Sequence, residues 1–224
     1  MNKIIYYSNT NESFKIANYI SSKTNYELIN ILDLNEYKYD SIYLIFPVYY
    51  QSIPKEIREI TKKIIANKAI VIATYGKMNY GNALYEVQKI LNAKIVAAAY
   101  VPVKHTYIAD DIEFNDYDKL DSIIDRMNND KEIVIPRHYK NLFSSFFPIT
   151  RHRLAIKIKK NDKCVFCNKC NSICKNINNG KVNHKCIRCL KCVKYCPYNG
   201  LDFKMSFFMK KYLKKKKIND FIIY

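Results

Sequence analysis

The sequence predicts an α/β doubly wound parallel sheet over residues 1–130, followed by a small α+β domain built on cysteines. Short apolar runs alternate with segments of helical periodicity through the first 130 residues, which is typical of βαβ units and a parallel sheet. All eight cysteines lie between Cys164 and Cys196. We therefore expect domains at 1–130 and 159–204, a connector at 131–158 and a basic C-terminal tail at 205–224.

Five segments of the first domain have the length and apolar character of buried strands: 3–7, 26–30, 43–46, 69–74 and 95–103. Helical spacing of apolar residues marks four intervening or following segments: 13–22, 54–65, 82–91 and 116–127. The second of these helices has Pro54 at its start, where proline is favoured. Right-handed crossovers between five such strands predict the order 2-1-3-4-5, the flavodoxin-like arrangement.

Two further segments carry a pattern near the cysteines. Residues 154–158 alternate apolar and polar side chains, which predicts an edge strand entering the second domain. Residues 205–213 place apolar side chains on one helical face, and a lysine run over 214–217 follows.

The cysteines form two runs of the same spacing, Cys-x2-Cys-x2-Cys-x3-Cys, and the second run repeats the first at an offset of 22 residues. The two runs consist of Cys164, Cys167, Cys170 and Cys174, and of Cys186, Cys189, Cys192 and Cys196 followed by Pro197. Without a signal peptide at the N-terminus, eight cysteines indicate metal ligands rather than disulfides.

This spacing predicts two [4Fe–4S] clusters with crossed ligation, because the fourth cysteine of each run ligates the other cluster. The first cluster would take Cys164, Cys167, Cys170 and Cys196, and the second would take Cys186, Cys189, Cys192 and Cys174. A zinc site on the two CxxC pairs is the alternative. Zinc would leave four cysteines without a metal. The runs resemble bacterial two-cluster ferredoxins over about 40 residues, with Lys175 where proline often follows the fourth cysteine.

A polar loop follows the first predicted strand and begins the first helix. It reads Ser8-Asn9-Thr10-Asn11-Glu12-Ser13, and a helix N-terminus with hydroxyl side chains favours a phosphate. The loop resembles the FMN-phosphate loop of flavodoxins. That resemblance implies phosphate-binding hydroxyls at Ser8, Thr10 and Ser13, with Asn11 in place of glycine and a carboxylate at Glu12.

Two more loops are expected beside a flavin ring, because the carboxyl ends of the first, third and fourth strands converge in this fold. One loop contains Tyr49 and the other contains Tyr75 and Gly76. Either tyrosine could stack on an isoalloxazine ring.

The order of the two parts resembles flavodoxin–ferredoxin fusion proteins. The resemblance implies an electron-transfer protein that moves electrons between a redox partner and FMN through two [4Fe–4S] clusters. Two alternatives remain open. One is a flavin-dependent reductase of a small molecule, and the other is a basic iron–sulfur binding module whose clusters are structural.

Charge separates the two halves. Residues 1–150 hold 18 Lys and Arg against 17 Asp and Glu, whereas residues 151–224 hold 20 against three. We expect the basic half to dock an acidic redox protein. The alternatives are peripheral contact with an anionic membrane, a solvated lysine-rich face without a partner, and nucleic acid, for which no recognition motif is present. The N-terminus and the lack of a long apolar run predict a cytoplasmic protein.

Overall fold

A computed structural model describes residues 1–108, 111–138, 148–215 and 217–224. The chain divides into two compact units. Unit 1 comprises residues 1–141 together with the last eight residues, 217–224, and unit 2 comprises residues 142–216. The cysteine-bearing unit is thus an insertion in the sequence of the first unit.

Unit 1 contains a parallel sheet in the predicted order. Its parallel strands run β2-β1-β3-β4-β5. Their bounds are β1 (Asn2–Tyr6), β2 (Glu27–Asn30), β3 (Lys38–Pro47), β4 (Ile65–Tyr75) and β5 (Asn92–Pro102). The centres of β3, β4 and β5 are apolar on both faces and fully buried, as a sheet covered on both sides requires. The predicted α/β flavodoxin-like fold of this part is confirmed.

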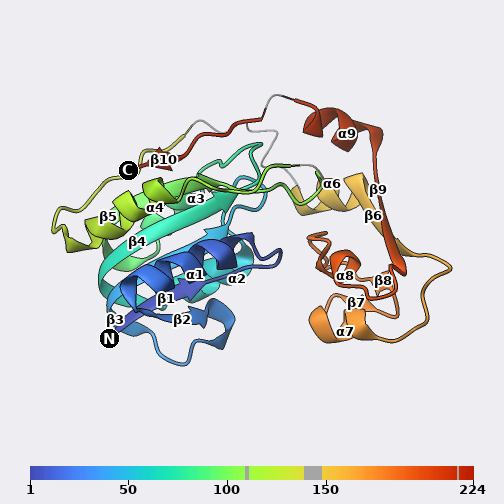
Figure 1. Cartoon of the computed structure of the whole chain (residues 1–224), viewed down its shortest axis with the longest axis horizontal. Coiled ribbons are helices and arrows are strands. Elements are labelled where there is room, and N and C mark those ends of the chain that lie inside the picture. Colours follow the sequence, from blue (N-terminus) through green and yellow to red (C-terminus); the bar gives the residue numbers. More distant parts are fainter. Residues whose placement is uncertain (109–110, 139–147, 216) are drawn as a thin grey trace. The chain divides into compact units, whose positions relative to one another are not determined.

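Helices cover both faces of this sheet (Figure 1). One face packs against α1 (Glu12–Thr24) and α4 (Tyr117–Ile124), which is followed by η2 (Asp125–Asn128). The other face packs against α2 (Lys55–Thr61) and α3 (Ala83–Gln88), and η1 (Ile31–Asp33) follows β2. This arrangement brings the loops after β1, β3 and β4 together at the carboxyl ends of the parallel strands.

The last eight residues complete unit 1, where we had expected the end of a basic tail. β10 (Ile222–Ile223) pairs antiparallel with β5 and so adds a sixth strand beside β5, at the lateral edge of the sheet. The buried Tyr75 hydroxyl donates to the carbonyls of Ile218, at 3.2 Å, and Asp220, at 2.7 Å. These bonds attach the segment to the end of β4.

Unit 2 is small and mixes short helices with two antiparallel strand pairs. In chain order its elements are α6 (Pro148–Ala155), β6 (Ile156–Lys160), α7 (Lys169–Ile173), β7 (Ile177–Asn178), β8 (Lys181–Val182), α8 (Lys191–Lys194), β9 (Leu201–Met205) and α9 (Phe207–Leu213). β6 pairs with β9, and β7 pairs with β8. The strand predicted at 154–158 is shifted, because α6 continues to Ala155.

The predicted connector over 131–158 overlaps these elements in part. Its last eleven residues, from 148 onwards, form α6 and the start of β6, and its apolar stretch at 142–147 lies outside the described residues. The predicted apolar-faced segment at 205–213 begins at the end of β9 and forms α9. None of the helices within the described ranges is long and apolar enough to cross a membrane.

Candidate functional site

The two cysteine loops of unit 2 share an unusual backbone conformation. Phe166 and Asn168 have φ values of 53° and 58°, and the residues 22 positions later, Arg188 and Leu190, have φ values of 60° and 61°. Residues other than glycine seldom adopt positive φ. The internal repeat in the sequence is therefore also a repeat in backbone conformation.

This conformation suits an anionic group. Alternation of left-handed and right-handed residues turns successive backbone N–H groups toward one point, a nest found at many phosphate and iron–sulfur sites. Asn168 and Leu190 are also the N-cap residues of α7 and α8. Each CxxCxxC run thus places three thiols on a loop with the left-handed residues that occur in such nests.

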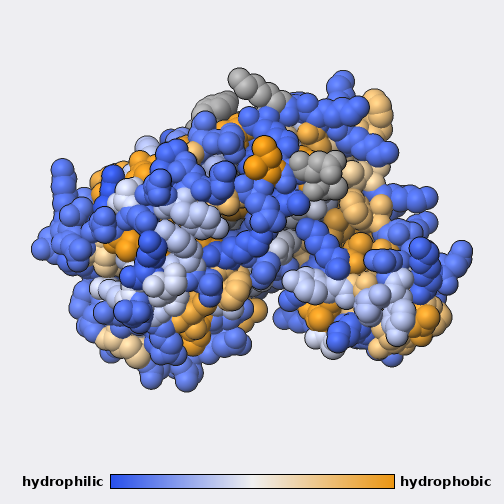
Figure 2. Space-filling view, in the orientation of Figure 1, coloured by the Kyte–Doolittle hydropathy of each residue, from blue (hydrophilic) through white to orange (hydrophobic). Residues whose placement is uncertain are grey.

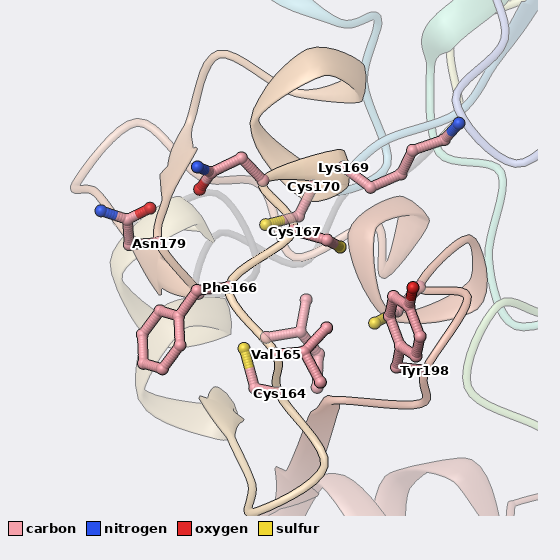
Figure 3. Close-up of a pocket in the computed structure, with 12 residues that line it drawn as sticks. Cys164, Val165, Phe166, Cys167, Lys169, Cys170, Asn179 and Tyr198 are labelled. Carbon is pink, nitrogen blue, oxygen red and sulfur yellow. The ribbon is translucent and has the colours of Figure 1, made fainter.

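The four cysteines predicted to bind the first cluster line one pocket. Cys164, Cys167, Cys170 and Cys196 all line it, although Cys196 belongs to the second sequence run. Figure 3 shows the sulfur atoms of Cys167 and Cys170 near each other and that of Cys164 apart from them, with the Lys169 side chain pointing away. The donor set fits crossed ligation, in which each run lends its fourth cysteine to the other.

The second set is more deeply buried. Cys186 and Cys192 are only 7% and 5% exposed. Burial, and then the neighbouring Cys189, Cys186 and Cys174, raise the pKa of the Cys192 thiol to about 12. Burial is also the main reason that the pKa of Cys189 is raised, with Cys174 and Cys186 adding to it. Cys174 of the first run therefore lies among the thiols of the second.

Backbone N–H groups bind the sulfur atoms in both sets. The Gly200 N–H donates to Cys196 Sγ at 3.2 Å, and the Arg188 N–H donates to Cys186 Sγ at 3.4 Å. Such bonds stabilise thiolates and are one of the means by which a protein sets the potential of an iron–sulfur cluster. The raised pKa values of Cys189 and Cys192 favour their protonated thiols, so a metal bound there would have to displace these protons.

The two kinds of metal centre considered for these thiols need different distances between the sulfur atoms. Within the described ranges, no group of three or more His, Cys, Asp or Glu side chains is placed to hold one metal ion. Tetrahedral zinc with bonds of about 2.3 Å needs sulfur atoms about 3.8 Å apart. A cubane binds each thiolate through a different iron atom and so needs a wider set.

Gly200 provides a test of the first set. A Cβ on this residue would lie 2.7 Å from Cys164 Cα and 3.1 Å from Cys164 Cβ, so a side chain must displace the cysteine loop. We expect Gly200→Ala to remove about half of the bound iron, that of the first cluster. Iron analysis of the anaerobic protein measures this, with Lys194→Ala, an exposed residue of α8, as the control. Full iron in Gly200→Ala would contradict the assignment.

The loops of the predicted flavin site converge at one end of unit 1. The Asn9 side chain donates to the Tyr49 hydroxyl at 2.9 Å and so joins the loops after β1 and β3. The buried hydroxyls of Ser13 and Thr74 are 2.8 Å apart and join α1 to the end of β4. The Val48 N–H donates to the Thr74 carbonyl at 2.7 Å.

The phosphate-type loop retains one hydroxyl without a partner. Ser8 Oγ is buried and forms no hydrogen bond within the described part of the chain. Asn11 has a φ of 74°, so it takes the left-handed backbone that glycine favours. Thr10 is partly exposed in the same loop, whereas the Ser13 hydroxyl is occupied by Thr74. Ser8, Thr10 and the backbone at Asn11 remain suited to a phosphate.

The negative charge of Glu12, which would repel a phosphate, is partly offset by a neighbouring lysine. Its carboxylate is 14% exposed and lies 3.4 Å from Lys15 Nζ. Lys15 also binds Glu113, whose hydrogen bond is the largest reason that the pKa of Lys15 is raised. A persistent cation therefore accompanies this carboxylate.

The two predicted stacking tyrosines differ in their surroundings. Tyr49 is partly exposed beside Asn9. Tyr75 is 1% exposed and packs in the core, which removes it from stacking on a flavin. Gly76 lies against His105, where a Cβ would come within 2.6 Å of the imidazole ring. Tyr49 and Gly76 remain at the converging loops, and Tyr75 serves the core.

One buried cluster of charged side chains next to these loops could not be predicted from the sequence. Asp111 is buried between Lys217 Nζ, at 2.7 Å, and Lys77 Nζ, at 3.4 Å, and accepts from the His105 N–H at 2.7 Å. Burial favours its neutral form, but the Lys217 and His105 hydrogen bonds and the Lys77 charge prevail and lower the pKa of Asp111. The group fixes the loop after β4 to the final segment of the chain.

Comparison with known proteins adds little beyond this geometry. No protein-family model matches the chain, and no curated protein matches it. Two solved structures, each named a "putative flavoprotein", are similar over 46% of this chain. The one from Bacteroides uniformis has a TM-score of 0.38, 16% identity and 91% of its own length covered. The one from Bacteroides eggerthii has values of 0.34, 17% and 89%. The flavodoxin-like fold of unit 1 rests on its strand order.

Proposed function

We propose that the protein transfers electrons between a redox partner and a flavin through two [4Fe–4S] clusters in unit 2. The observation that carries this proposal is the grouping of eight thiols into two sets of four, each completed by the fourth cysteine of the other run. The repeated left-handed loops and the N–H bonds to sulfur support it.

The proposal for FMN in unit 1 rests on the converging loops. The unpartnered Ser8 hydroxyl and the Asn11 backbone would hold the phosphate at the start of α1. Tyr49 and Gly76 would lie beside the ring. When bound, the clusters each exchange one electron and FMN exchanges two. The chain supplies position, hydrogen bonds and charge.

Ser8 provides a test that separates phosphate recognition from ring binding. We expect Ser8→Ala to weaken FMN binding about tenfold or more, because a hydrogen bond to a charged group is lost, and to leave riboflavin binding unchanged. Quenching of flavin fluorescence measures both affinities. Ser22→Ala is the control, since that exposed hydroxyl bonds only within α1. Equal losses for both flavins would contradict a phosphate role for Ser8.

Glu12 is expected to act in the opposite direction. Removing its charge in Glu12→Gln should tighten FMN binding by up to about fivefold, the size of one full like-charge interaction at short range in water, because Lys15 already offsets part of that charge. Riboflavin affinity should again stay constant, because riboflavin carries no phosphate. An unchanged FMN affinity would mean that the phosphate lies away from α1.

An acidic redox protein is the proposed partner. Unit 2 contains 19 Lys and Arg against Asp162 and Asp202, and two oxidised clusters of charge about −2 each would leave it strongly positive. Apolar side chains near the first thiol set are exposed by half or more, namely Val165, Phe166, Tyr195 and Tyr198. An apolar centre inside a basic surface suits the docking of an acidic electron partner.

Small oxidants of opposite charge test this face. We expect the dithionite-reduced protein to be oxidised faster by an anionic metal complex than by a cationic complex of similar potential. Salt should slow the first reaction and accelerate the second. Stopped-flow absorbance measures the rates. Equal rates with no salt dependence would contradict electrostatic steering.

A further inference from the structure

The helix α9 presents apolar side chains to solvent. Phe207 and Phe208, at its start, are 73% and 81% exposed, and their ring centroids are 5.9 Å apart. Met209 and Leu213 are half-buried on the inner side. Burying two phenylalanines would be favourable, so this exposed pair marks a contact site.

The pair is held on a defined support. The Ser206 hydroxyl accepts from the Met209 N–H at 3.3 Å and caps the helix. β9 leads directly into α9 and pairs with β6 along five residues of each strand. The phenylalanines thus project from an ordered element rather than from a loose end.

Positive charge lies on and next to the helix that carries the pair. Lys210, Lys211, Lys214 and Lys215 are exposed on and just after the helix, and the sequence contains no acidic residue between Asp202 and Asp220. Lys157 and Lys204, both exposed, are directly opposite each other in β6 and β9, where like charges repel. In Figure 2 the surface over α9 is largely hydrophilic with a hydrophobic patch within it.

We propose that α9 is a peripheral membrane anchor that inserts Phe207 and Phe208 into an anionic bilayer. Exposed aromatic residues beside a lysine cluster match the apolar and headgroup layers of such a surface. A second copy of the chain would bring a like-charged surface. Nucleic acid offers no apolar layer for two phenylalanines.

Anaerobic flotation of the protein and its clusters with lipid vesicles tests this proposal. One type is phosphatidylcholine, and the other contains about one third phosphatidylserine. We expect binding to the anionic vesicles only, and weaker binding as salt rises. Phe207→Ser/Phe208→Ser should lower the partition coefficient at least about tenfold. Lys211→Glu/Lys215→Glu should lower it by more than about tenfold.

Two control variants make comparable changes of charge and of apolar surface away from α9. Lys181→Glu/Lys185→Glu makes the same change of net charge at exposed positions away from α9, and Val134→Ser removes an 82% exposed apolar side chain from unit 1. Each should lower binding less than the corresponding α9 variant. The visible spectrum confirms that every variant keeps its clusters. Equal binding to both vesicle types, or a phenylalanine variant that binds like the wild type, would overturn the proposal.

Discussion

Removal of both clusters is expected to unfold unit 2 and leave unit 1 folded. Among the residues described in unit 2, the buried aliphatic side chains are few: Ile156, Ile158, Ile177, Leu190 and Leu201. A unit of this size with so small a core usually depends on bound metal. Loss of the negatively charged clusters would also increase the electrostatic repulsion among the Lys and Arg side chains of unit 2. Unit 1 has an extensive core on each face of its sheet.

Hydrogen exchange of the apo-protein measures this effect. After the clusters are removed by oxidation and chelation, amides of residues 148–215 should exchange at rates close to those of an unfolded chain. Amides of β1, β3, β4 and β5 should stay protected. Iron with sulfide should restore protection in unit 2, whereas zinc alone should not. Protection that persists in the apo-protein would show that the clusters do not hold the unit together.

Paired cysteine variants are expected to reveal crossed ligation. Cys164→Ala and Cys196→Ala should each remove the first cluster, and the double variant should remove no more iron than either single variant. Cys164→Ala/Cys174→Ala should remove both clusters, although these two residues belong to one sequence run. Non-additive losses identify groups that act together.

Iron and sulfide analysis gives the result directly. Each single variant should retain about four iron atoms, and Cys164→Ala/Cys174→Ala should retain none. Cys174→Ala/Cys186→Ala should again retain about four. If instead Cys164→Ala/Cys174→Ala keeps one cluster, each run binds its own cluster and the crossed assignment is wrong.

Much of unit 1 could be predicted because its strands are continuous apolar runs. The segment 69–74 lies within β4, and 95–103 overlaps β5 up to Pro102, since strands buried on both faces leave a strong signal. The predicted ends were short by several residues, because Ile65 and Asn92 begin their strands outside the apolar core.

Tyr75 illustrates what the pattern left undecided. Alternate residues of a strand face opposite sides of the sheet. The Thr74 hydroxyl contacts Ser13 of α1, so Tyr75 faces the opposite side of the sheet. There the Asp220 carbonyl, in the final segment of the chain, accepts a hydrogen bond from the Tyr75 hydroxyl. The position at a strand end was clear from the sequence, but the face was not.

The final segment carried only a weak signal. Phe221–Tyr224 is a short apolar run, and β10 pairs with a strand far earlier in the chain. Nothing local specifies that partner or its register. The Asp111 ion pairs were equally hidden, because Lys77, Asp111 and Lys217 are distant in sequence. In the cysteine loops the spacing predicted the ligands, but not the positive φ of Phe166, Arg188 and Leu190.

The most direct test of the proposed electron-transfer function is joint quantification of iron, acid-labile sulfide and flavin in protein purified without oxygen, with visible spectra before and after dithionite. The account predicts about eight iron atoms, about eight sulfides and about one FMN per chain, with absorbance that bleaches on reduction. Zinc in place of iron, without sulfide, would contradict it.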